Sequence, residues 1–156
     1  GYMVTIRPKT VITHRMQAAR TSETRIDLEV RGHAITIDER TESGGTDQGI
    51  SPVETLLTAL VGCTNRITHK VADMHGVEIE NLAVDLESNF DRRGTQLMEE
   101  VTVPFPSMTL KIEITTGASD GDVAKVKRDL AKYCAISKVL RESGTEIAEE
   151  WTVKRP

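Results

Sequence analysis

Aromatic side chains are scarce in this sequence of 156 residues, where Trp, Tyr and Phe together make up 3%. The apolar fraction, 38%, is also low for a globular domain. A chain of this length suits one domain, residues 1–156, and can bury a core without disulfides or a structural metal. The surplus of polar residues is consistent with an elongated molecule, with a core shared between subunits, or with an ordinary polar monomer. Composition alone does not distinguish these three alternatives.

Long apolar runs and an excess of positive charge are absent as well. No run approaches the roughly 18 apolar residues that a membrane-spanning helix needs, so we expect no membrane association. The net charge of −4 lacks the basic footprint of a nucleic-acid-binding protein. The first residues, GYMVTIRPKTV, lack the apolar segment of a secretory signal. We therefore expect a cytoplasmic, reducing location, where cysteines are more often thiols than permanent disulfides.

Only two cysteines occur, Cys63 and Cys134, and they form no CxxC redox motif. The spacing between them and the histidines is not that of a zinc site, so zinc binding is a poor alternative. A G-x-S-x-G motif for serine catalysis is also absent. The four histidines are His14, His33, His69 and His75.

Alternation of apolar residues, helical periodicity and turn residues divide the chain into about ten elements. Short turns between most strands indicate a mainly antiparallel sheet, and the long helix after Ser51-Pro52 must cover it, so we predict an α+β fold. A shift of the apolar phase at Asn81 predicts a β-bulge. The predicted strands are 10–18, 25–31, 33–38, 77–88, a strand after the turn at 91–95 that runs to 103, 108–114 and 149–155; the predicted helices are 51–75, 121–133 and 135–143.

Cys63 lies on the flank of the apolar face of the long predicted helix. At about 100° per residue, it falls roughly 60° from the centre of that face, with Lys70 and Arg66 toward the polar side. A nearby cation lowers a thiol pKa and favours the reactive thiolate, whereas an apolar environment raises it. A small buried side chain in a core is the alternative for Cys63, since cysteine often packs in this way.

Cys134 lies where one helical stripe ends and another begins. Val123, Val126 and Leu130 share a face with it, but the apolar residues after Cys134 form a different face. This change of phase predicts a helix break and places Cys134 at a helix N-terminus, where the dipole favours a thiolate. A buried residue at a helix junction is an equally consistent interpretation.

The segment GGTDQGISPVETLLTALVGCT, residues 44–64, resembles the signature of the OsmC/Ohr family of osmotically inducible and organic hydroperoxide resistance proteins. The segments VPFPSMTLKIEI and YCAISKVL, 103–114 and 133–140, resemble it in type and order. The resemblance implies an intertwined homodimer with active sites at the subunit interface. It also implies thiol-dependent reduction of organic hydroperoxides or hydrogen peroxide, in which Cys63 is the peroxidatic thiolate, Cys134 the resolving thiol and an external dithiol the reductant.

The sequence departs from that family's pattern at the acid that activates the thiol. The family's Glu corresponds to Val53 here, and the nearest acid, Glu54, points about 180° away from Cys63 on an ideal helix. The family's Arg comes from the early strands, which makes Arg20, or alternatively Arg25, its candidate here. Two further hypotheses stay open: a non-catalytic OsmC-like stress protein that binds small molecules or thiols, and a structural stress protein with inert cysteines.

Overall fold

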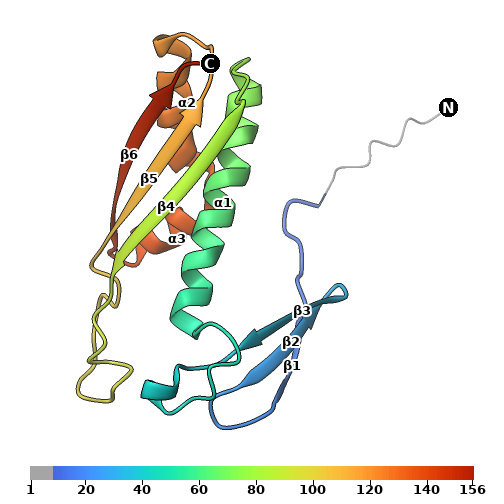
Figure 1. Ribbon diagram of the computed structural model, residues 1–156, viewed down its shortest axis with the longest axis vertical. Helices are drawn as coiled ribbons and strands as arrows, with labels where there is room; N and C mark the ends of the chain where they lie inside the picture. Colours follow the sequence, from blue (N-terminus) through green and yellow to red (C-terminus); the bar gives the residue numbers. More distant parts are fainter. Residues whose placement is uncertain (1–8) are drawn as a thin grey trace, which may run out of the picture. The chain divides into compact units, whose positions relative to one another are not determined.

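The computed structural model describes residues 9–156, which divide after Thr55 into two units, each with a three-stranded sheet. The predicted α+β class is confirmed (Figure 1). No helix in residues 9–156 is both long and apolar enough to cross a membrane. In chain order the elements are β1 (Gln17–Arg20), β2 (Ile26–Val30), β3 (His33–Ile37), the 3-10 helix η1 (Thr41–Ser43), α1 (Pro52–Met74), β4 (Asn81–Asn89), β5 (Ser107–Thr115), α2 (Asp120–Tyr133), α3 (Ala135–Glu142) and β6 (Glu146–Lys154).

The first sheet is antiparallel, with β2 between β1 and β3. The β2–β3 turn places Arg31 and Gly32 at φ 53° and 81°, as the tight turns that suit the twist of a hairpin require. The predicted strand at 10–18 is wrong for most of its length, because β1 begins at Gln17. β2 has five residues and β1 pairs with four of them, so the earlier residues have no strand to pair with.

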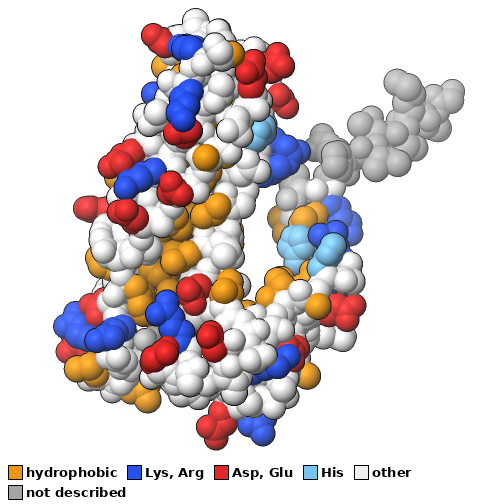
Figure 2. Space-filling model, in the orientation of Figure 1, with side chains coloured by type: hydrophobic (Ala, Val, Ile, Leu, Met, Phe, Trp, Pro, Cys, Tyr) orange, Lys and Arg blue, Asp and Glu red, His pale blue; other side chains and the backbone are white. Residues whose placement is uncertain are grey.

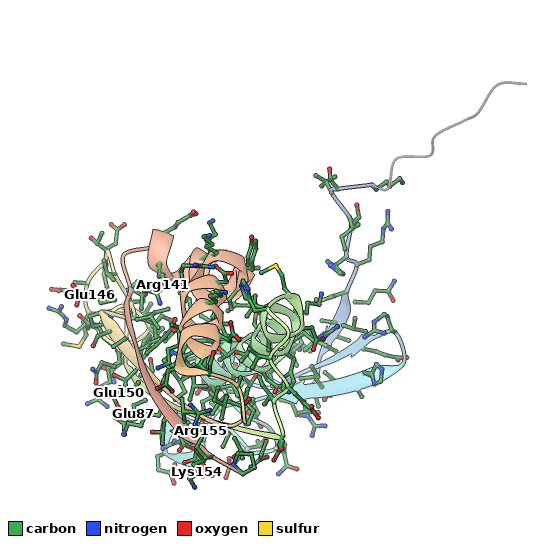
Figure 3. All side chains as sticks on the ribbon, turned by 90° about the horizontal axis from the view of Figure 1, so that it is seen from above. Glu87, Arg141, Glu146, Glu150, Lys154 and Arg155 are labelled. Carbon is green, nitrogen blue, oxygen red and sulfur yellow. The ribbon has the colours of Figure 1, made fainter. Side chains whose placement is uncertain are left out.

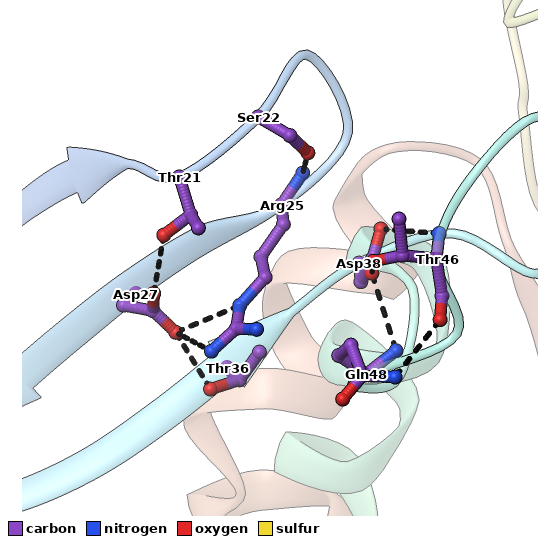
Figure 4. Close-up of polar contacts among 8 residues, drawn as sticks. All are labelled: Thr21, Ser22, Arg25, Asp27, Thr36, Asp38, Thr46 and Gln48. Carbon is purple, nitrogen blue, oxygen red and sulfur yellow. Dashed lines mark hydrogen bonds and ion pairs between the residues drawn. The ribbon is translucent and has the colours of Figure 1, made fainter.

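The loop that follows β3 is built around one buried carboxylate (Figure 4). Asp38 is 0% exposed, and it accepts hydrogen bonds from the Thr46 hydroxyl and from the Gln48 N–H at 3.2 Å. Gly49 passes so close to Thr36 that a Cβ there would lie 2.2 Å from the Thr36 carbonyl oxygen. The Gly-rich segment therefore has a packing role, in which the glycine admits a close approach of two backbone segments.

The second sheet has β5 at its centre, antiparallel to β4 and parallel to β6. The parallel pair follows from the connection, because α2 and α3 lie between β5 and β6 and form a crossover. The prediction of a mainly antiparallel sheet thus holds for β1–β2, β2–β3 and β4–β5, and β5–β6 departs from it.

The core of the second unit lies between this sheet and the helices that cover one of its faces (Figure 1). Alternate β5 side chains are buried, as expected for a strand packed on one face. One cluster joins Val71 and Ala72 of α1 to Val126 of α2, with Trp151 of β6 packed against it. The buried apolar residues of β5 are Met108, Leu110, Ile112 and Ile114, and those of α2 are Val123, Val126 and Leu130.

The opposite face of this sheet is charged. Figure 2 shows acidic and basic side chains interspersed over the second unit, and Figure 3 shows Glu87 and Glu150 on the side of the sheet away from the helices. Lys111 of β5 pairs with Glu87 of β4 at 3.0 Å, and Lys154 pairs with Glu113 at the same distance. These exposed pairs contribute little stability, but they keep this face polar.

One bulge prediction and one strand prediction between α1 and β5 are wrong. β4 pairs without interruption from Asn81 to Asn89, so the phase shift at Asn81 marks the start of the strand and not a bulge. The residues up to 103 form a turn-rich loop instead of a strand, with hydrogen bonds from the Leu97 N–H to Gly94 and from the Met98 N–H to Arg93. No strand lies beside this segment to complete a ladder, so it forms local turns.

Candidate active site

The structure brings the two cysteines together. The Cys134 Sγ donates a hydrogen bond to the Cys63 Sγ at 2.9 Å, although the residues are 71 positions apart. Both are free thiols. Because a disulfide bond is about 2.05 Å long, the sulfurs need to approach by only about 0.9 Å to form one.

Cys134 occupies the break between α2 and α3 that the sequence predicts. Its backbone is extended, with φ −74° and ψ 105°, so it ends α2 and starts α3. Its N–H donates to the Leu130 carbonyl, and its own carbonyl accepts from the Lys138 N–H and the Ser137 hydroxyl. The main chain of Cys134 is thus bonded into both helices, and the direction of its side chain toward α1 is fixed.

The two thiols differ in their access to solvent. Cys134 is 1% exposed, whereas Cys63 is half-buried on α1. A reactant can reach Cys63 first, and Cys134 lies behind it in the protein. This asymmetry suits a pair in which one sulfur meets the substrate and the other acts on the product.

Several groups act on the ionisation of Cys63. Burial raises the pKa of the Cys63 thiol most, and contact with the Cys134 sulfur raises it further, because two negative charges 2.9 Å apart repel each other. The backbone N–H groups of Ile136 and Ala135 oppose this and lower the pKa. The net result is a pKa of the Cys63 thiol above its usual value.

A groove of about 420 Å³ lies along α1, about one to three helical turns after Cys63, and neither cysteine lines it. Its α1 residues continue the side of the helix that carries Cys63, because Lys70 and Met74 lie within about 20° of Cys63 around the helix axis. On the other side it is bordered by Tyr133, the residue next to Cys134. The lining is mainly apolar with one cation: Ile67, Lys70, Val71, Met74 and Tyr133.

A sequence model of the OsmC-like protein family matches residues 45–150, which is most of the chain and includes both cysteines. The chain belongs to the OsmC-like family. No protein of curated function matches it.

Solved structures of OsmC-like proteins share this fold. The OsmC-like protein of Mycoplasma pneumoniae has a TM-score of 0.77 at 18% identity, over 92% of this chain and 98% of that one. An organic hydroperoxide resistance protein OsmC of Legionella pneumophila has a TM-score of 0.68 at 15% identity, over 92% and 99%. The organic hydroperoxide resistance protein of Bacillus subtilis has a TM-score of 0.58 at 15% identity, over 90% and 98%. At these identities the likeness concerns the fold.

Glu54, a candidate site residue from the sequence, caps the helix of this OsmC-like chain. Its carboxylate accepts the Ser51 N–H at 3.0 Å, while the Ser51 hydroxyl accepts the Glu54 N–H at 3.1 Å. This reciprocal pair is a capping box, and it lowers the pKa of Glu54. Arg40 lies 4.0 Å from the same carboxylate. A catalytic role for Glu54 stays a prediction, and so does the loss of activation at Val53.

The two arginines proposed from the sequence lie in the first unit. Arg20 is exposed at the end of β1. Arg25 is paired with Asp27 at 3.2 Å, and Thr36 also donates to that carboxylate at 2.7 Å (Figure 4). Of the two, only Arg25 has its guanidinium in an ion pair; within residues 9–55 the Arg20 side chain makes no hydrogen bond or ion pair. A role for either beside Cys63 stays a prediction.

The sequence analysis missed a buried polar pair. His75 Nε2 lies 2.5 Å from Asp129 Oδ2, which joins the end of α1 to α2. Asp129 is 3% exposed, and its hydrogen bonds from Arg128 and His75 hold its pKa well below the usual value. No spacing rule links a histidine and an aspartate 54 residues apart. Across residues 9–156, no three His, Cys, Asp or Glu side chains are grouped as metal ligands.

Proposed function

We propose that this chain is a two-cysteine peroxidase that reduces organic hydroperoxides, or hydrogen peroxide, at the expense of an external dithiol. The observation that carries the proposal is the 2.9 Å contact between a half-buried and a fully buried thiol. Packing alone gives no reason for two free sulfurs from distant segments to be aligned for bond formation. The family match and the hydroperoxide-resistance proteins of the same fold support this reading.

Three steps complete the reaction. The Cys63 thiolate attacks the peroxide, so that an S–O bond forms, the O–O bond breaks, and the alkoxide takes a proton and leaves as an alcohol. The Cys134 thiol then attacks the sulfenic sulfur; an S–S bond forms, the S–O bond breaks, and water leaves with the thiol proton. The external dithiol reduces this disulfide by two exchanges and becomes a disulfide itself. No cofactor enters these steps.

The apolar groove supports an organic peroxide as the substrate. It runs along α1 from about one helical turn after Cys63, and the one cation in its lining is Lys70. Burying the hydrocarbon part of a hydroperoxide there contributes binding energy that hydrogen peroxide does not offer. We therefore expect a lower KM for cumene hydroperoxide than for hydrogen peroxide.

The active form proposed is a cytoplasmic homodimer. Asp38 is the one buried residue between positions 9 and 55, so the first sheet has no core of its own. Val11, Ile12 and Met16 are 64–84% exposed, and Ile35 of β3 is 47% exposed. A second copy that covers these side chains explains how the unit keeps its fold. Light scattering during size-exclusion chromatography measures the mass directly.

The raised pKa of Cys63 favours a second candidate, a non-catalytic OsmC-like protein that binds small molecules or thiols. A thiol that keeps its proton at neutral pH is a weak nucleophile. This candidate predicts a thermal shift with low-molecular-weight thiols and no turnover of peroxide.

Stopped-flow consumption of cumene hydroperoxide with dithiothreitol decides between them. The proposal predicts turnover by the wild type and loss of at least a hundredfold in Cys63→Ser. In Cys134→Ala it predicts that, with the dithiol left out, about one equivalent of peroxide is consumed and the reaction stops at the sulfenic acid. Asn65→Ser is the matched control, because Asn65 is exposed on the same helix and, among residues 9–156, its bond with His69 is made by its main-chain carbonyl and not by its side chain. A wild-type rate equal to that of Cys63→Ser excludes the peroxidase.

A further inference from the structure

A second polar contact joins the two helices that carry the cysteines. His75 directly follows α1, and its Nε2 lies 2.5 Å from Oδ2 of Asp129 on α2. The Cys63–Cys134 contact joins the same helices, because Cys63 lies on α1 and Cys134 directly follows α2. Polar contacts therefore set the position of α1 against α2 at two points, and one of them is the cysteine pair.

Asp129 is a charged acceptor with little freedom to move. It is 3% exposed, and the neighbouring Arg128 guanidinium donates to its two oxygens at 2.9 and 3.2 Å. The bonds from Arg128 and His75 hold the pKa of Asp129 well below its usual value, so it is a carboxylate at neutral pH. A carboxylate only accepts, which makes His75 Nε2 the donor. The bond therefore has a defined donor on one helix and a fixed acceptor on the other.

Apolar packing fixes the register of the two helices less closely. Val71 and Ala72 pack with Val126, but apolar contacts are non-directional. The groove between α1 and Tyr133 also leaves the packing of these helices incomplete. A hydrogen bond, by contrast, has a narrow range of length and angle. Because α1 is one continuous helix, a slide at its end also moves Cys63, and a sulfur moved about 0.9 Å farther away has twice the distance to close.

We propose that His75 is a positioning residue of the cysteine pair, which holds α1 in register with α2 through Asp129 and keeps the Cys63 sulfur within reach of Cys134. This rests on the proposed function, in which the second step joins the two sulfurs. His75 acts through the helices and touches neither sulfur in that step. Its bond raises the effective concentration of one thiol at the other, and so favours the disulfide over the dithiol.

The measurement is the equilibrium of the cysteine pair with glutathione. The two protein thiols lose two electrons and two protons and form one S–S bond, while the S–S bond of glutathione disulfide breaks and gives two glutathione thiols. We expect His75→Asn to lower the equilibrium constant for the protein disulfide about fivefold, a coupling of the size found between residues of one contact network. The reduction potential of the pair then rises by about 20 mV.

Two further variants separate positioning from a general loss of stability. His75→Gln carries an amide N–H close to the place of Nε2 and should restore the constant, whereas the amide of His75→Asn is one methylene shorter and falls short of Asp129. His69→Asn is the matched control, because the His69 ring bonds to the Asn65 carbonyl within α1, at 2.8 Å. A merely structural His75 would destabilise the reduced and oxidised proteins equally and leave the constant unchanged. Circular dichroism checks the fold of each variant.

A wild-type constant in His75→Asn, or an equal fall in His75→Gln, overturns the inference. If His75→Asn does not fold, the wild type still decides. By linkage, the disulfide must strengthen the bond between His75 and Asp129 as much as that bond favours the disulfide. The His75 Nε2 proton must therefore exchange with solvent about fivefold more slowly in the oxidised protein, as measured by NMR, and equal exchange rates overturn the inference.

Neither test uses peroxide, so the two proposals can fail separately. A protein with the expected fall in the constant and no turnover of peroxide refutes the proposed function alone. Turnover with an unchanged constant in His75→Asn refutes the positioning role alone.

Discussion

Oxidation of the cysteine pair is expected to raise the free energy of unfolding by about 4 kcal/mol. The cross-link joins residues 71 positions apart, and closing a loop of that length removes this much conformational entropy from the unfolded chain. The native state changes little, because the sulfurs are already 2.9 Å apart. For a chain of this size the difference corresponds to a rise of about 10 °C in Tm.

Urea unfolding monitored by circular dichroism measures this difference. One sample is oxidised with diamide and the other is kept in dithiothreitol, and mass spectrometry confirms the Cys63–Cys134 link. Cys134→Ala, treated in the same two ways, is the control, and its two curves should coincide. A confirmed disulfide with an unchanged free energy of unfolding refutes the reasoning. Strain in the folded state would then cancel the entropic effect of the cross-link on the unfolded chain.

Two further predictions concern the first unit and the start of α1. Hydrogen bonds hold the pKa of Asp38 below its usual value, so the folded state binds this proton less readily than the unfolded state. The free energy of unfolding should therefore fall as the pH drops below about 4. This acid-induced fall should be smaller in Asp38→Asn than in the exposed control Asp47→Asn. Glu54→Ala should lower the free energy of unfolding in urea by about 1 kcal/mol or less, because the helix cap is lost, and it should leave the rate of Cys63 alkylation unchanged. The exposed control Glu42→Ala should change neither quantity. Equal acid sensitivity of the two aspartate variants, or slowed alkylation in Glu54→Ala, contradicts these expectations.

Much of the second unit can be predicted from local patterns. Proline after Ser51, a helical apolar stripe and Gly76 at φ 67° define α1, which ends two residues before that glycine. The change of apolar phase after Cys134 predicts the junction of α2 and α3, and the structure has it at that residue. Strict alternation around Leu110 and Ile112 predicts β5. In each case the signal lies within a few residues of the feature.

The failed strand predictions have a common cause. Residues 10–18 and the segment up to 103 have some apolar alternation, but a strand also needs a partner at hydrogen-bonding distance. β2 is too short to pair with more than four residues of the first segment. The second segment forms local turns. Whether a partner exists depends on the rest of the fold, so alternation alone misleads there.

The sequence by itself determined the helix that carries Cys63, the helix break that carries Cys134 and the family that both belong to. Only the tertiary structure decided that the two sulfurs meet, because no local rule fixes a contact across 71 positions. The sequence places Cys134 at that helix end, and in the structure its side chain turns toward the Cys63 sulfur of α1.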